Sequence, residues 1–106
     1  MPKYLLEASY TLDGIKGIAA KGGTARKSAV QAAVKSVGGK LDAFYFAFGK
    51  YDAVLIVDVP DNTAAAALAL AVGASGAVNL RTTALLTPDE LDAASGKDVK
   101  YRPPGT

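Results

Sequence analysis

Phe48-Gly49-Lys50-Tyr51-Asp52 lies between two apolar runs, 44–48 and 53–59, whose composition is typical of β-strands. A glycine and an aspartate between two such runs predict the tip of a β-hairpin. We expect Gly49 to supply the positive φ that a tight turn requires. Asp52 is expected to bond to nearby backbone or to pair with a basic residue of another chain, and Tyr51 to anchor an interface through its apolar ring.

On the N-terminal side of this hairpin, residues 4–10 are predicted to form a strand. The glycine-rich segment 11–23 is predicted to be a loop with one helical turn around 15–20. Thr24 is expected to cap a helix that runs to about Val37, because apolar residues recur there at helical spacing and two glycines follow.

On the C-terminal side, Pro60-Asp61-Asn62-Thr63 predicts the start of an alanine-rich helix that ends near Val72. A strand is predicted over 77–86. Thr87 then caps a short helix over 88–94, with a proline at its first position.

The order β-α-β-β-α-β predicts an α+β fold of the ferredoxin-like type, a split βαβ sandwich with an antiparallel sheet. The strand order is expected to be 4-1-3-2. Residues 1–95 are assigned to one domain, and 96–106 to a polar C-terminal tail.

The second and third predicted strands are mostly apolar on both of their faces. A sheet with one face open to water normally alternates apolar and polar residues. We therefore expect another protein surface to cover the open face, most simply that of a second copy, which would give a homodimer or a higher homo-oligomer. The alternative is a monomer whose tail partly covers the sheet.

The composition excludes several classes of function. With 12 basic and 10 acidic side chains the net charge is +2, so no strong field attracts nucleic acid or an anionic membrane. RNA-binding domains of the same topology stack bases on aromatic residues of the central strands, and the 53–59 strand has no aromatic residue. Neither a nucleic acid nor a membrane is expected as a partner.

The chain has no cysteine and no histidine, which excludes thiolate catalysis and metal centres built on those ligands. The carboxylates are not spaced like an oxygen-ligand metal loop. No metal and no cofactor are therefore expected. The longest apolar stretch is too short to span a bilayer, and the N-terminus has no signal-peptide pattern, so a cytoplasmic protein of bacterial type is expected.

Polar residues on the expected open face of the sheet form the first candidate ligand site. If Leu6 and Ala8 face the helices, strand parity turns the polar side chains of three strands outward. The expected site consists of Glu7, Ser9, Tyr45, Asp58 and Arg81. Such a cluster suits a small polar ligand. The alternatives are an ion pair that fixes the register of a dimer, or simple exposure of these residues at strand ends.

The second candidate site is an anion-binding loop at the start of the first long helix. Basic residues in a first helical turn oppose the helix dipole, whereas a bound anion would reverse that effect. The site would consist of Gly22, Gly23, Thr24, Arg26 and Lys27, with Arg26 as the clamp. The alternative is a solvated basic turn.

The hairpin motif and several shorter stretches together resemble the GYD-domain family of small bacterial proteins. The supporting stretches are Gly22-Gly23-Thr24-Ala25-Arg26, Gly38-Gly39-Lys40-Leu41, Pro60-Asp61-Asn62, Ser75-Gly76-Ala77-Val78 and Arg81-Thr82-Thr83. The resemblance covers about 4–94. It implies a ferredoxin-like domain of the dimeric α/β-barrel type, and it carries over Gly49, Tyr51 and Asp52 as motif residues without a catalytic role.

Two functions follow as hypotheses. The first is a homo-oligomeric domain that binds a small metabolite, such as an anion, or acts as a regulator. The second is a cofactor-independent enzyme of the dimeric-barrel type, such as a monooxygenase, isomerase or cyclase. Without histidine, acid–base catalysis would fall to Glu7, Asp58, Tyr45 or Tyr51, and Arg81 would stabilise an enolate or oxyanion.

Overall fold

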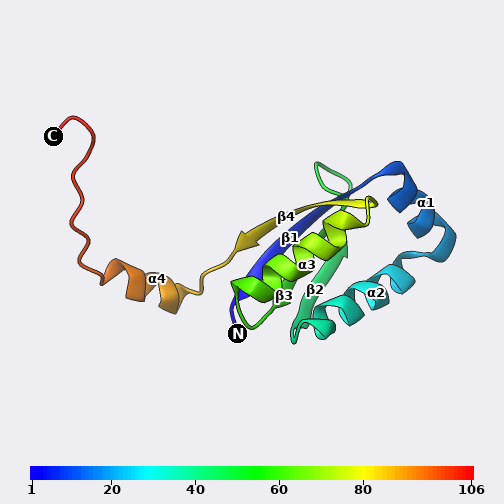
Figure 1. Cartoon of the computed structure of the whole chain (residues 1–106), viewed down its shortest axis with the longest axis horizontal. Helices are drawn as coiled ribbons and strands as arrows, with labels where there is room; N and C mark the ends of the chain where they lie inside the picture. Colours follow the sequence, from blue (N-terminus) through cyan, green and yellow to red (C-terminus); the bar gives the residue numbers. More distant parts are fainter.

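Four strands form one antiparallel sheet with the order β2-β3-β1-β4, which confirms the predicted ferredoxin-like topology (Figure 1). The computed structural model describes all residues, 1–106. Its elements are β1 (Lys3–Tyr10), α1 (Leu12–Lys21), α2 (Gly23–Ser36), β2 (Lys40–Phe46), β3 (Ala53–Asp58), α3 (Asn62–Ala74), β4 (Val78–Ala84) and α4 (Pro88–Ser95).

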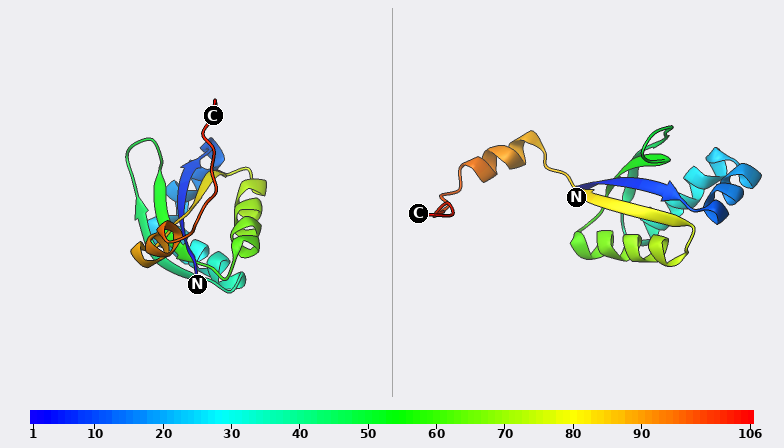
Figure 2. Two further views of the ribbon diagram at one scale, coloured as in Figure 1. Left: turned by 90° about the vertical axis from the view of Figure 1, so that its left-hand side faces the viewer. Right: turned by 90° about the horizontal axis from the view of Figure 1, so that it is seen from above.

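Helices α2 and α3 cover one face of this sheet (Figures 1 and 2). The alternate residues Tyr4, Leu6 and Ala8 of β1 are buried on that face, together with the alternate residues of β3. Val34 of α2 and Leu68 of α3 pack against them. The residues between these positions turn to the opposite face, which no helix covers.

Strand β2 departs from the regular alternation expected of it. A β-bulge lies between Leu41 and Ala43, so that Leu41 and Phe44 both pack on the core. Regular alternation of side chains along a strand would place these two residues, three positions apart, on opposite faces, and it does not hold at this point. The extra residue, Asp42, shifts the parity of the strand. Its carboxylate accepts a hydrogen bond from Lys3 Nζ at 3.1 Å.

Residues 12–21 form a complete helix, α1, where the sequence pattern predicted a loop. The Thr11 side chain accepts a hydrogen bond from the Gly14 N–H and so caps this helix. Gly14 is needed there because a Cβ atom would lie 2.2 Å from the Ala77 carbonyl oxygen. The loop prediction failed because Gly14 serves close packing inside a helix rather than a turn.

Helix α2 follows α1 after a single residue, Gly22, whose φ of 87° provides the change of direction. Gly22 is the N-cap of α2, and no side chain caps this helix. The prediction that Thr24 caps it was therefore wrong, because Thr24 lies inside the first turn. By contrast, the predicted starts of α3 at Asp61 and of α4 at Thr87 are confirmed by side-chain caps.

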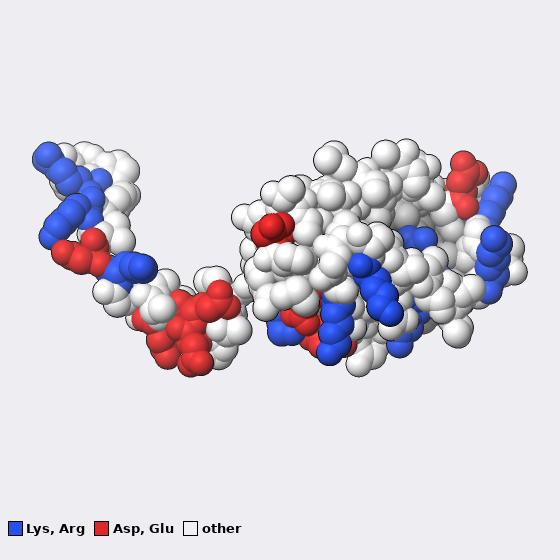
Figure 3. Space-filling model, turned by 60° about the horizontal axis from the view of Figure 1, so that its bottom comes forward, with Lys and Arg blue, Asp and Glu red and all other residues white.

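Residues 86–106, here named the C-terminal arm, extend away from the body (Figures 1 and 2). The chain measures 57 × 32 × 23 Å, and its radius of gyration is 16.8 Å, whereas a compact chain of this length has about 13 Å. Every residue of the arm is exposed. Acidic side chains gather on α4 and basic ones lie mainly beyond it (Figure 3). None of the helices combines the length and apolar character needed to cross a membrane.

Candidate functional site

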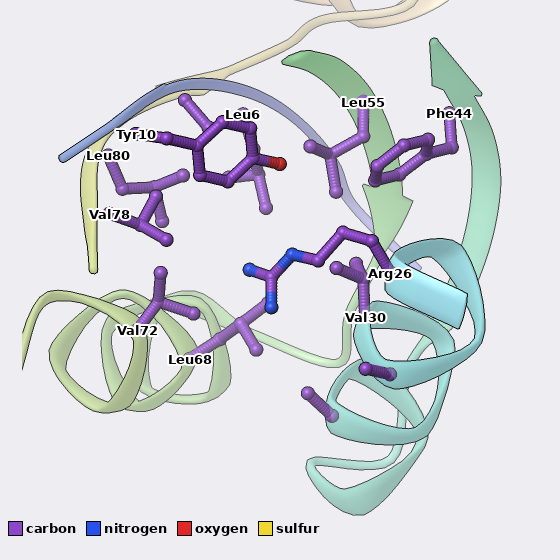
Figure 4. Close-up of a pocket in the computed structure, with 13 residues that line it drawn as sticks. Leu6, Tyr10, Arg26, Val30, Phe44, Leu55, Leu68, Val72, Val78 and Leu80 are labelled. Atoms are coloured by element: carbon purple, nitrogen blue, oxygen red, sulfur yellow. The ribbon is translucent and has the colours of Figure 1, made fainter. Parts of the chain in front are cut away.

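A partly open cavity of about 90 Å³ lies between the sheet and helices α2 and α3 (Figure 4). Twelve of its thirteen lining residues are hydrophobic, and they come from all four strands and both helices. Helix α2 contributes Ala29 and Ala33, whose small side chains leave space where larger ones would fill the core. The cavity therefore offers an apolar environment in the centre of the domain.

The one charged lining residue is Arg26, which extends from α2 into the cavity (Figure 4). Its Nε atom is buried and has no hydrogen-bond partner. Its guanidinium carbon lies 5.7 Å from the centre of the Tyr10 ring, within the range of a cation–π interaction. No carboxylate pairs with it, because the three ion pairs of the chain involve only Lys3 and Lys100. The cavity thus holds an unpaired cation.

Arg26 also borders two further hollows, which extend the cavity on either side. One, of about 320 Å³, lies between α1, α2 and the start of β4, and it includes the side chains of Asp13 and Lys21. The other, of about 240 Å³, lies between α2 and α3 and includes Ser36 and Ser75. The Arg26 side chain is therefore at the junction of all three spaces.

The remaining residues of the predicted anion-binding loop do not gather around Arg26. The Gly22 N–H is already used, since it donates to the Ile18 carbonyl at 2.7 Å. Thr24 and Lys27 are exposed, and neither lines the cavity. Gly23 lies under the Phe46 ring, where a Cβ atom would be 2.7 Å from Cε2.

The prediction selected Arg26 as the clamp of an anion-binding loop. In the structure its side chain points between the helix and the sheet (Figure 4). The helical spacing of the sequence indicates this orientation. Arg26 precedes Val30 by four residues and Ala33 by seven, and both of these residues line the same cavity. Arg26 thus continues the apolar stripe of α2 toward its N-terminus.

The second predicted site, on the open sheet face, is brought together in part. Glu7 lies opposite Arg81 on β4 and opposite Val54 on β3, and Val54 in turn lies opposite Tyr45 on β2. These residues form one row across the sheet. Ser9 lies opposite Asn79, two residues further along the strands.

Asp58 does not join this row. It lies opposite Lys3 at the other end of β1 and accepts a hydrogen bond from Lys3 Nζ at 2.8 Å. The hydrogen bonds from Lys3 to Asp58 and to Asp42 raise the pKa of the Lys3 ammonium above its ordinary value of 10.5. The expectation that Asp58 neighbours Glu7 and Arg81 was wrong, because the register places it two rows away.

Arg81 and Tyr51 meet on the open face, where Arg81 Nη1 donates a hydrogen bond to Tyr51 Oη at 3.0 Å. Glu7 forms no ion pair with Arg81, although the two are cross-strand neighbours. No group of three or more acidic side chains is arranged to hold a metal ion.

Asp52 ties the hairpin tip to β1 through both its backbone and its side chain. Its N–H donates to the Ala8 carbonyl at 2.8 Å, and its carboxylate accepts from the Tyr10 N–H at 2.9 Å. Of the alternatives for Asp52, the bond to nearby backbone is the one present. It bonds to the neighbouring strand rather than within the turn.

Gly49 does not have the predicted positive φ. The connection between Phe46 and Ala53 is six residues long, so the backbone turns without a left-handed residue at this position. A Cβ atom on Gly49 would meet nothing within 4 Å. Neighbouring Phe48 is fully exposed.

The open antiparallel sheet, with helices on one face and a cavity beneath them, defines a small ferredoxin-like α+β domain. The sequence model of the GYD domain matches residues 4–94, so the chain belongs to the GYD domain family, and the resemblance found in the sequence is confirmed. Neither a curated protein nor a solved structure matches the chain significantly.

Proposed function

We propose that this GYD domain is a self-associating, small-molecule-binding domain whose ligand is an amphipathic carboxylate. The carboxylate would pair with Arg26, and the apolar part would occupy the cavity between the sheet and the helices. The observation that carries this proposal is the unpaired Arg26 guanidinium beside an apolar cavity. The experiment below tests the charge and the apolar part of the ligand separately.

The unpaired charge indicates an anion. Arg26 is half-buried and its Nε atom has lost contact with water, which is unfavourable for a cation unless it is paired and hydrogen-bonded. The planar guanidinium group matches a carboxylate, which accepts two parallel hydrogen bonds from it. The inner cavity has no second charged residue, and its only other polar side-chain group is the Tyr10 hydroxyl, whereas a doubly charged phosphate would require more partners. A singly charged carboxylate therefore fits better.

The lining indicates that the rest of the ligand is apolar. Leucine, valine and phenylalanine side chains surround the space, and polar ligand groups would find no partners among them. Apolar cavities of about 150 Å³ bind benzene, so 90 Å³ suits a few carbon atoms. A longer chain would continue past Arg26 into one of the neighbouring hollows.

Self-association is proposed from the open sheet face. Leu5, Val54 and Ile56 alternate with the buried residues and lie on that face, and Tyr45 beside them is exposed. Pairing of two sheets would remove these side chains from water. Glu7, Ser9 and Arg81 would then lie between the two copies and could receive a small polar ligand there.

The ligand proposal is tested by the thermal stability of the protein in the presence of sodium alkanoates, from butanoate to decanoate. We expect these acids to raise the melting temperature, while 1-alkanols of equal length have a much smaller effect. At a concentration one hundred times the Kd, the free energy of unfolding should rise by about 2.7 kcal/mol. Arg26→Met should abolish the effect of the acids.

The matched control is Lys27→Met, which removes a charge from the next residue, outside the cavity. It should keep the full response to the acids. Equal stabilisation by octanoate and 1-octanol, or an undiminished response in Arg26→Met, would show that Arg26 does not bind the carboxylate.

A further inference from the structure

The C-terminal arm carries a helix that has no partner in its own chain. Helix α4 has eight residues, and isolated helices this short are unstable in water. It is nevertheless well formed: the Glu90 N–H donates to the Thr87 hydroxyl, and the Glu90 carboxylate accepts from the Thr87 N–H. Even with this cap, a helix of eight residues needs packing against another surface to be stable.

One side of α4 is apolar. Leu86 immediately precedes the N-cap and Leu91 is the fourth helical residue, which are the two positions of a hydrophobic staple. Their side chains are 64% and 59% exposed. The other charged residues of α4 are Asp89 and Asp92, and no basic residue lies in the helix.

The tip of the β2–β3 hairpin is the second apolar feature without a partner. Phe48 is fully exposed there, and Phe46 and Tyr45 before it are also exposed. Lys50 lies beside them and is exposed as well. On α1, at the same end of the sheet, Lys16 and Lys21 are exposed too.

These two features lie at opposite ends of the sheet. The tip adjoins the end where Ala8 pairs with Ala53, while the arm leaves where Tyr4 pairs with Ala84 (Figure 1). If two copies pair face to face through their open sheets, with a two-fold axis perpendicular to the strands, each arm reaches the tip of the other copy.

We propose that α4 of one copy docks on the hairpin tip of a second copy, with Leu86 and Leu91 against Phe48. The acidic residues of α4 would face Lys50 and the lysines of α1, which gives complementary charge. The inference needs open space at the tip, and a Cβ atom on Gly49 would meet nothing within 4 Å. It rests on the self-association proposed above and adds the arm to the interface.

The absence of cysteine allows a direct test by disulfide trapping. Gly49→Cys keeps Phe48 in place and has open space around it, and Ala94→Cys lies one turn after Leu91 on α4. The two full-length variants are mixed and oxidised, and the linked peptides are identified by mass spectrometry. The control pairs each of them with Gln31→Cys, on the exposed surface of α2.

We expect the 49–94 disulfide between chains to exceed both control disulfides by on the order of tenfold, because docking raises the local concentration of the two thiols. Adding Leu91→Ser should reduce it to the control level. A single chain that carries both Gly49→Cys and Ala94→Cys provides the opposing test. If it formed an intrachain disulfide at high dilution, the arm would fold onto its own tip and the proposal would be overturned.

Sedimentation of the unmodified protein distinguishes docking of the arm from the self-association on which it rests. A dimer without excess 49–94 linkage would overturn docking of the arm and leave pairing of the sheets in place. A monomer at all concentrations would overturn both.

Discussion

The Asp52 carboxylate accepts a hydrogen bond from the backbone N–H of Tyr10, at 2.9 Å. This bond joins the motif of the hairpin tip to the last residue of β1, and the ring of that residue lies against the Arg26 guanidinium in the cavity. Asp52 is thus linked to the candidate ligand site through one intervening residue, although its own side chain does not line the site.

Asp52→Ala should destabilise the domain, because it leaves the Tyr10 N–H without its partner. A hydrogen bond to a charged group contributes about 1.5–3 kcal/mol, so we expect the free energy of unfolding to fall by about 2 kcal/mol. Urea denaturation measures this change. Asp98→Ala, in the exposed arm, is the control and should change stability by less than about 0.5 kcal/mol.

Arg26→Met should leave the ligand-free protein as stable as before, or more stable by up to about 1 kcal/mol. The substitution removes an unpaired charge from apolar surroundings, and methionine adapts to irregular space. The measurement is the urea midpoint of unfolding of Arg26→Met, compared with that of Lys27→Met. A loss of more than about 2 kcal/mol in the former would show that the Arg26 side chain supports the core by itself.

The fold was predictable because hydrophobic periodicity and capping residues specify each of its main elements. Residues 53–59 form a short, almost wholly apolar run bounded by turn signals, and Asp61 and Thr87 are strong N-caps, so these parts were placed correctly. Helix α1 was not predicted as a complete helix, because its segment is rich in glycine and has the composition of a loop. Only the approach of Ala77 to Gly14, a contact between segments far apart in sequence, explains why glycine is present in a helix.

The candidate site was predictable only in its central residue. Arg26 was selected for its charge at the start of a helix. Its partial burial depends on the residue at which α2 begins, and Gly22 rather than Thr24 is the N-cap of this helix. The cavity itself depends on how α2 and α3 are spaced over the sheet, which no local pattern encodes. On the open face, the position of Asp58 depends on the register of β1 with β3.

Gly14→Ala and Gly17→Ala should have opposite effects, although both replace a glycine inside α1. A Cβ atom at Gly14 would collide with the Ala77 carbonyl oxygen, and the helix would have to move from β4. We expect a loss of about 1–3 kcal/mol. At Gly17 nothing lies within 4 Å, so alanine should stabilise the helix by about 0.5–1 kcal/mol. Chemical denaturation of both variants decides this, and a stabilised Gly14→Ala would contradict the packing described for α1.

Lys3→Met should reduce stability at neutral pH but not in strong alkali. In the folded state the hydrogen bonds to Asp58 and Asp42 raise the pKa of Lys3 above 10.5, the value expected in the unfolded chain. The interaction therefore contributes fully below pH 10.5 and is lost as the pH rises through the folded-state pKa. The measurement is the difference in urea midpoint between the native protein and Lys3→Met across this range, with Lys27→Met as the control for general loss of a lysine. If the difference persisted unchanged in alkali, Lys3 would stabilise the sheet through packing of its aliphatic chain, and its charge would contribute nothing.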